Sequence, residues 1–364
     1  MTDKDYYPSL SQSIMVGCYR SGTEYATNLF ANHPRLSSSG YNINVMMWAY
    51  GLYDPISEPA NLRRAIADMA IRNRLRYNVI IDEEFVFAKC MEKQPVTYGV
   101  LYDVLMSSLM LTQTRRHWLE KVHHVWRRVP EFLNEVPNGR VIMVLRDPRS
   151  VMASFRKLTY VPPPAYFGAI FNVLDVMQHI EKYQETLPKE RFLWFRYEDA
   201  ALYPEETTQK VFDFLGLDPK EAGEEYRVNK WKKNTLFEEI GGEFNVQEAI
   251  YRWKKHLDAE ELSLAEFVCG KYLEKFGYEV NGKAADFDWP SVLKRILPSE
   301  QIAGAFRNFI LTGEGGQFWP ADPHDPRNWP EARGVKLHKR HEDDDGGNHK
   351  DAWDQVRLSL SQKS

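Results

Sequence analysis

Short, wholly apolar runs alternate with amphipathic stretches along this chain. Residues 14–16, 141–145 and 192–195 are apolar runs of strand length, and each is followed by apolar positions at helical spacing. Strands without a polar face are typical of a parallel sheet that is covered on both sides. The pattern therefore predicts an α/β fold with a central parallel sheet flanked by helices.

The same pattern predicts where this fold is elaborated. Residues 53–116 read as a mostly helical insertion that contains an amphipathic stretch at 60–80 and a buried helix at 98–111. A long helix is expected over 258–276, with Gly277 ending it. We expect one domain over residues 1–280. A C-terminal extension follows over 281–364, partly extended or disordered because it is rich in glycine, proline and charge.

Composition narrows the class of protein. The 364 residues include 47 Lys plus Arg and 51 Asp plus Glu, a net charge of −4, which disfavours a nucleic-acid binder. Three cysteines at 18, 90 and 269 have neither disulfide nor zinc spacing and favour a reducing compartment. The polar N-terminus lacks a signal peptide, and the apolar stretch 98–113 is too short and polar to span a bilayer. We expect a cytoplasmic protein without a membrane span.

A glycine-containing turn lies between the first strand and its helix, at residues 17–23 (GCYRSGT). Its backbone N–H groups would converge on an anion. The spacing copies the start of a phosphate-binding P-loop, but Thr23 stands at the lysine position and Glu24 at the magnesium-binding Ser/Thr position. The turn therefore suits a phosphate-like anion without metal, with Arg20 as the cation. A tight turn without ligand is the alternative.

A second element follows the strand at 141–145. Arg146 ends this strand, and Ser154 lies two turns into the next helix. Ligands bind at the carboxyl ends of strands in open α/β sheets, and arginine and serine both donate to phosphate. The alternative is a solvated Arg146–Asp147 pair that caps the helix.

Together these motifs resemble the sulfotransferases that use 3′-phosphoadenosine 5′-phosphosulfate (PAPS). The resemblance covers about residues 13–278, implies the P-loop-like sulfotransferase fold, and implies that PAPS is the donor and 3′,5′-adenosine bisphosphate (PAP) the product. Four signatures occur in family order: Arg20-Ser21-Gly22-Thr23 for the 5′-phosphosulfate, Arg146 and Ser154 for the 3′-phosphate, 195–216 with its Tyr197-Glu198-Asp199, and Trp253-Lys254. Tyr197 is implied to contact the adenine.

The resemblance also implies the catalytic groups. Lys121 and His123 match a K-x-H pair, in which the lysine stabilises charge on the leaving phosphosulfate and the histidine removes the acceptor's proton. Arg20 is expected to assist at the phosphosulfate. By spacing alone, Lys121 and His123 could be exposed helix residues. If His123 is not the base, Glu83 or Glu84 is the reserve.

Two departures from the family pattern leave rivals open. Glu24 places an acid beside the expected anion, and residues 241–244 (GGEF) lack the cations that the cytosolic enzymes use on the 3′-phosphate, so Arg252 or Lys254 would replace them. The rivals are a P-loop kinase of a small molecule and an inactive sulfotransferase-like binding protein. The acceptor is expected to be a small metabolite, lipid or glycan, and the insertion 53–116 would shape its site.

Overall fold

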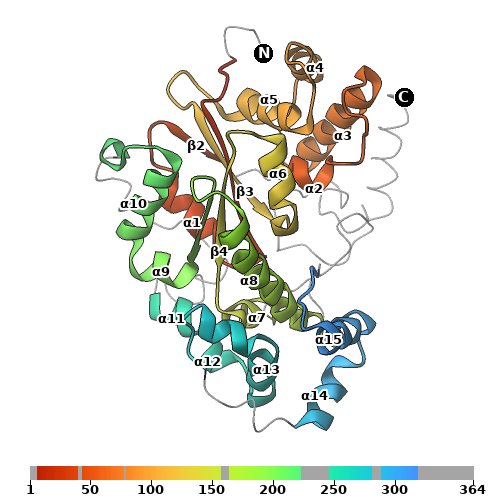
Figure 1. Ribbon diagram of the computed structural model, residues 1–364, viewed down its shortest axis with the longest axis vertical. Helices are drawn as coiled ribbons and strands as arrows, with labels where there is room; N and C mark the ends of the chain where they lie inside the picture. Colours follow the sequence, from red (N-terminus) through yellow and green to blue (C-terminus); the bar gives the residue numbers. More distant parts are fainter. Residues whose placement is uncertain are drawn as a thin grey trace. The chain divides into compact units, whose positions relative to one another are not determined.

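A five-stranded parallel sheet forms the centre of the fold. The computed structural model describes residues 6–39, 43–77, 79–156, 164–222, 246–280 and 288–318 (Figure 1). The strands are β1 (Ser11–Gly17), β2 (Leu36–Ser39), β3 (His117–His123), β4 (Arg140–Leu145) and β5 (Phe192–Arg196). Their order in the sheet is β2-β3-β1-β4-β5. This confirms the predicted α/β fold with a central parallel sheet flanked by helices.

Two of the five strands, β2 and β3, were not predicted from the hydrophobic pattern. They pair in parallel from Leu36 opposite His117 to Ser39 opposite Glu120. In β3, the buried residues include Glu120, whose carboxylate accepts the Tyr102 hydroxyl, and Trp118, whose ring N–H donates to Asp103. A strand that is covered on both faces is recognised in sequence by an unbroken apolar run. In β3 that run is interrupted by polar residues, which are buried because they have hydrogen-bond partners.

Contacts divide the described residues into two units, and the first contains those of residues 6–14 and 34–141. Its core forms where Trp118 of β3 packs on Tyr102, which in turn meets Phe132. The apolar stretch that predicted a buried helix at 98–111 forms α5. The helices of this unit are α2 (Val45–Trp48), α3 (Pro59–Tyr77), α4 (Glu83–Met91), α5 (Tyr98–Met110), η2 (Trp126–Arg128) and α6 (Val129–Glu135).

The second unit contains the described part of residues 15–33 and 142–320. Local chemistry sets its helix ends. Gly277 takes the left-handed conformation after the long helix, as predicted, Gly216 does the same at another helix end, and Asp258 forms a capping box with Glu261. Its helices are α1 (Thr23–Phe30), α7 (Pro148–Arg156), η3 (Ala165–Phe167), α8 (Gly168–Thr186), α9 (Tyr197–Leu202), α10 (Pro204–Leu215), η4 (Pro219–Ala222), α11 (Val246–Tyr251), α12 (Trp253–His256) and α13 (Ala259–Lys275).

The C-terminal extension is more regular than the sequence suggested. It contains α14 (Trp289–Ile296) and α15 (Glu300–Thr312), and Phe318 then packs on Phe171 of α8. The glycine- and charge-rich residues 319–364 lie outside the described residues. No stretch of helix in the described ranges has the length and hydropathy that a bilayer-spanning helix needs.

Candidate functional site

The turn between β1 and α1 has the backbone of an anion-binding loop. Arg20 and Gly22 both take positive φ, at 67° and 87°. The Ser21 hydroxyl donates to the carbonyl of Cys18 at 2.8 Å and closes the turn. Gly22 caps α1 without a side-chain hydrogen bond, so no capping side chain occupies the N-terminus of that helix. The first N–H groups of a helix lack partners within the helix and can bind an anion, which is the role that the glycine spacing predicts for this turn.

Two glycines are needed here because other groups come close. A Cβ on Gly17 would lie 3.2 Å from the carbonyl oxygen of Val144 in β4 and closer still to the side chains of Ser21 and Thr23. A Cβ on Gly22 would overlap the ring of Tyr197. The loop is thus packed against the carboxyl ends of β4 and β5, where the other predicted donor-site residues lie.

Arg146 links these elements. One guanidinium nitrogen donates to the carbonyl of Arg20 at 2.9 Å, another donates to the carbonyl of Ala249 at 2.6 Å, and its centre lies 4.3 Å from that of the Tyr197 ring. Arg20 in turn donates through Nε to the Ser154 hydroxyl at 2.8 Å.

The structure therefore brings together the seven residues that the sequence assigned to the donor, which are Arg20, Ser21, Gly22, Thr23, Arg146, Ser154 and Tyr197. Their individual roles toward a ligand stay predictions.

Three arginines act electrostatically on Tyr197. Burial raises the pKa of this phenol above its ordinary value, and Arg146, Arg252 and Arg20 oppose that rise. Arg252, which the sequence offered as a replacement cation, is itself only 6% exposed. Gathering like charges at one place costs free energy in the unliganded protein, and a ligand with several negative charges recovers that free energy.

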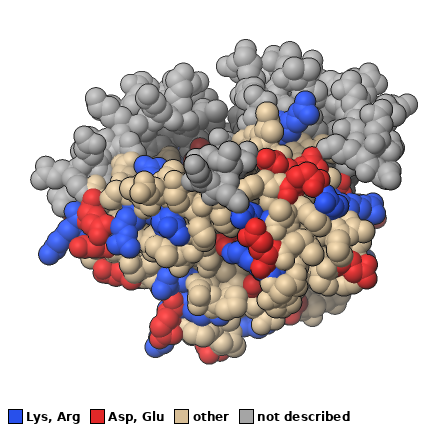
Figure 2. All heavy atoms as spheres, turned by 90° about the horizontal axis from the view of Figure 1, so that it is seen from above, with Lys and Arg blue, Asp and Glu red and all other residues tan. Residues whose placement is uncertain are grey.

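This concentration of cations is local. Figure 2 shows basic and acidic side chains interspersed over the face in view, in keeping with the balanced composition. A broad basic surface for nucleic acid is not seen on that face. The arginines around Tyr197 instead suit a compact polyanion.

Behind the loop lies a buried ionic frame that the sequence did not reveal. Arg149 is 1% exposed, pairs with Asp147 at 2.8 Å and Glu266 at 3.2 Å, and lies 4.0 Å from the centre of the Trp253 ring. Asp147 does cap the helix after β4, because its carboxylate accepts the N–H of Arg149 at 2.8 Å. The alternative of a solvated Arg146–Asp147 pair is wrong in exposure and partner, since Asp147 is buried and pairs with Arg149. The Trp253 signature thus has a structural role.

Glu198 completes this frame. Its carboxylate accepts the N–H of Asp147 at 3.1 Å and the hydroxyl of Tyr278 at 3.1 Å. Burial, and then the charge of Asp147, raise the pKa of Glu198 to about 7. The Tyr-Glu-Asp run at 197–199 therefore joins the ends of β4 and β5, because Tyr197 packs on the loop and Glu198 binds the N–H of Asp147, the residue after Arg146.

Glu24, the acid that departs from the family pattern, lies in the first turn of α1. Its side chain is exposed, whereas its neighbours Thr23 and Tyr25 are buried. Successive residues of a helix point about 100° apart, so the acid is not packed among the residues beneath the loop.

Lys121 and His123 belong to the first unit. They lie at the carboxyl end of β3, so the alternative that placed them on a helix is wrong. Strand alternation puts both half-exposed side chains on one face, while buried Val122 faces the other way. Asn44, in a left-handed conformation, donates to the carbonyl of His123 at 3.4 Å.

The acids near this strand differ in their surroundings. Glu120 is buried, accepts the N–H of Asn44 at 3.0 Å, and has its pKa raised to about 7 by burial. The reserve bases Glu83 and Glu84 lie in the first turn of α4, and the exposed Glu84 pairs with Arg63 at 2.5 Å. Only Glu84 is held in this exposed ion pair, so His123 as the base and Glu83 as its reserve stay predictions.

One predicted feature cannot be placed, because the glycine-rich stretch 241–244 lies outside the described residues. Among the residues that are described, no group of three or more His, Cys, Asp or Glu side chains is arranged to hold a metal ion.

Comparison with known proteins gives one family. The sulfotransferase family matches residues 14–221. Carbohydrate sulfotransferase 3 of Tetronarce californica is 25% identical over 205 residues (49% of this chain, 46% of that protein), and human carbohydrate sulfotransferase 1 is 28% identical over 198 residues (45% and 46%). This chain thus matches about half the length of these relatives. A solved sulfotransferase domain from the Synechococcus PCC 7002 olefin synthase aligns with a TM-score of 0.48 at 19% identity, covering 76% of this chain and 97% of that one.

Proposed function

The chain belongs to the sulfotransferase family, and from that premise we propose that it transfers a sulfuryl group from PAPS to a hydroxyl or amine acceptor by in-line displacement. The observation that carries this proposal is the pair of contacts by which Arg146 joins the β1–α1 loop to Tyr197, one to the carbonyl of Arg20 at 2.9 Å and one to the Tyr197 ring at 4.3 Å. PAPS carries negative charge at both the 3′ and the 5′ position of its ribose. Main-chain N–H groups at a helix start and neighbouring arginines are the groups that bind such charges.

In this proposal the second unit binds the donor. The loop amides and Arg20 hold the 5′-phosphosulfate, while Arg146 and Ser154 hold the 3′-phosphate, with Arg252 as the added cation. The donors present fit such a group, because guanidinium forks pair with phosphate oxygens and the buried Ser154 can donate its own proton while it accepts from Arg20. The packing of Tyr197 on Gly22 supports a role at the adenosine end.

The chemical step is assigned to β3. His123 accepts the proton of the acceptor group, whose oxygen or nitrogen then bonds to sulfur as the bond from sulfur to the bridging phosphate oxygen breaks. Lys121 and Arg20 stabilise the negative charge that develops on the departing phosphate. The half-exposed position of both residues at the end of a parallel strand supports these assignments, since that edge of a sheet is where ligands bind.

For the acceptor, we propose a glycan or another small hydroxyl-bearing molecule or lipid. The carbohydrate sulfotransferases that this chain resembles favour the glycan. We also propose a reducing, cytoplasmic compartment, because Cys18, Cys90 and Cys269 are buried free thiols.

The first test is thermal stabilisation by PAP. At a hundred times its Kd, PAP should add about 2.7 kcal/mol to the free energy of unfolding and raise Tm visibly, whereas ATP with Mg²⁺ should not. Stabilisation by ATP with Mg²⁺ alone would replace the proposal with a kinase. Stabilisation by PAP without transfer from PAPS to any of a panel of sugars, phenols and amines would favour the inactive binding protein.

Replacing Arg146 by alanine is expected to weaken PAP binding by about 10- to 100-fold, since hydrogen bonds to a charged group contribute about 1.5–3 kcal/mol. Isothermal titration calorimetry measures the change. Arg307, an exposed residue of α15, gives the matched control, and Arg307→Ala should leave the Kd for PAP unchanged. Equal affinity of Arg146→Ala and the wild type would remove the 3′-phosphate assignment.

A further inference from the structure

Helix α7, which carries Ser154, is held at both ends by helix α13. Arg149 in its first turn pairs with Glu266 at 3.2 Å, and Arg156 in its last turn pairs with Glu261 at 3.0 Å. Both glutamates have buried side chains, 1% and 0% exposed. Two charged contacts about two helical turns apart fix both the axial position and the rotation of α7.

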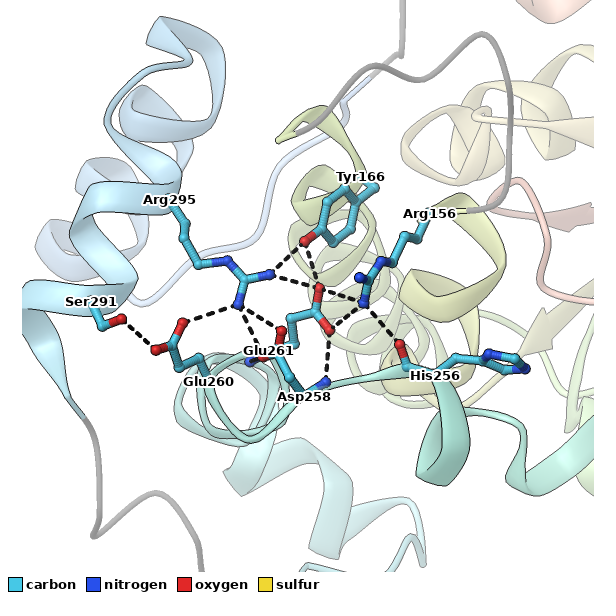
Figure 3. A network of polar contacts seen from close by, with 8 residues as sticks. All are labelled: Arg156, Tyr166, His256, Asp258, Glu260, Glu261, Ser291 and Arg295. Atoms are coloured by element: carbon cyan, nitrogen blue, oxygen red, sulfur yellow. Dashed lines mark hydrogen bonds and ion pairs between the residues drawn. The ribbon is translucent and has the colours of Figure 1, made fainter.

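Glu261 is the centre of the second contact. Figure 3 shows Arg156, Arg295 and Tyr166 all directed at its carboxylate. Arg295 donates to it at 2.9 Å, the Tyr166 hydroxyl at 2.5 Å, and the N–H of Asp258 at 2.9 Å. A carboxylate with no exposure keeps its charge only with such partners, so each donor helps to hold the others in place.

Arg295 comes from α14, in the C-terminal extension and beyond the residues that match the family. Besides Glu261, it pairs with Asp258 at 2.9 Å and Glu260 at 3.1 Å, and Ser291 of the same helix donates to Glu260 (Figure 3). The extension is therefore joined to the first turn of α13 by charge as well as by packing.

The route from this network to the donor site is short. Arg156 follows Ser154 by two residues on the same turn of α7, and its guanidinium also donates to the carbonyl of His256 at 2.9 Å. The Ser154 hydroxyl accepts from Arg20 of the loop at 2.8 Å. A shift of this last turn would move Ser154 away from both Arg20 and the ligand.

We propose that Glu261 and Arg295 are positioning residues of the donor site, which act through Arg156 to fix the turn of α7 that carries Ser154. The inference rests on the proposed use of PAPS. It gives the C-terminal extension a part in donor binding.

The test measures PAP affinity by calorimetry on full-length variants, well below each variant's Tm. Glu261→Gln keeps the shape but removes the charge that holds both arginines, and should weaken PAP binding by roughly five- to twentyfold. Arg295→Ala should weaken it by a smaller factor, and Arg295→Lys should restore most of the loss.

A double-mutant cycle separates positioning from general stability. If Glu261 acts through Ser154, the variant with both Glu261→Gln and Ser154→Ala binds PAP no more weakly than Ser154→Ala alone, within about twofold. Additive losses would overturn the inference. Glu300→Gln is the matched control, because Glu300 is an exposed glutamate of α15 that takes no part in this network, and it should leave the Kd unchanged.

The outcomes also separate this inference from the proposed function. If the wild type binds PAP and Glu261→Gln binds it equally well, only the positioning role is wrong. If the wild type does not bind PAP, the proposed function fails and the inference fails with it.

Discussion

Replacing Arg149 by alanine is expected to lower the free energy of unfolding by about 3–5 kcal/mol. This guanidinium is buried between Asp147 and Glu266 and stacks on Trp253. Its removal leaves two buried carboxylates without their cation, and restoring water to them requires local unfolding. Because domains are stable by only about 5–15 kcal/mol, the loss would be a large share of the total. Urea denaturation followed by circular dichroism measures it.

Two further variants define the cause. Arg63→Ala removes an exposed arginine whose partner Glu84 is also exposed, and should cost less than about 1 kcal/mol. Adding Glu266→Gln to Arg149→Ala removes one of the stranded charges and should recover part of the stability. If Arg149→Ala unfolds at the same urea concentration as the wild type, the ionic frame does not support the donor loop.

Replacing His123 by alanine is expected to reduce turnover by about 10²- to 10⁴-fold, the range for loss of a general base. PAP affinity should stay at the wild-type value, because the donor residues lie on β1, β4, β5 and the helices that follow them. Sulfuryl transfer from radiolabelled PAPS to the best acceptor of the sugar, phenol and amine panel gives kcat, and calorimetry gives the Kd for PAP.

The pH dependence of the rate provides an independent test of His123 as the base. A neutral imidazole accepts the acceptor's proton, so the wild-type rate should fall as the pH is lowered, and that fall should be absent from His123→Ala. His179→Ala, at a half-exposed histidine of α8, is the control and should keep both rate and profile. If His123→Ala turns over at the wild-type rate, His123 is not the base and Glu120 is the next candidate. Burial raises the pKa of Glu120 to about 7, which the sequence could not indicate.

The donor loop shows which features of the structure can be predicted from neighbouring residues in the sequence. The positive φ of Gly22 and the start of a helix at Pro148 depend on a few neighbouring residues, so spacing alone predicts them. The close approach of Val144 to Gly17 and of Tyr197 to Gly22 is a tertiary contact that spacing does not show. The strands β1, β4 and β5 were predicted because a strand that is covered on both faces consists almost wholly of apolar residues, which is visible in the sequence.

What only the tertiary structure decided is the set of partners of buried polar groups. In the sequence, Arg149, Glu261 and Glu198 look like surface residues, because charge usually signals exposure. Each has a partner at least 80 positions away in the chain: Glu266 for Arg149 at 117, Arg156 for Glu261 at 105 and Tyr278 for Glu198 at 80. The free energy of a buried charge depends on groups that are distant in the chain, so no local pattern encodes it. The sequence by itself therefore determined the α/β fold class, three of the five strands, the loop and the resemblance to the family. The strands β2 and β3, the ionic frame and the ion pairs of the C-terminal extension came from the tertiary structure.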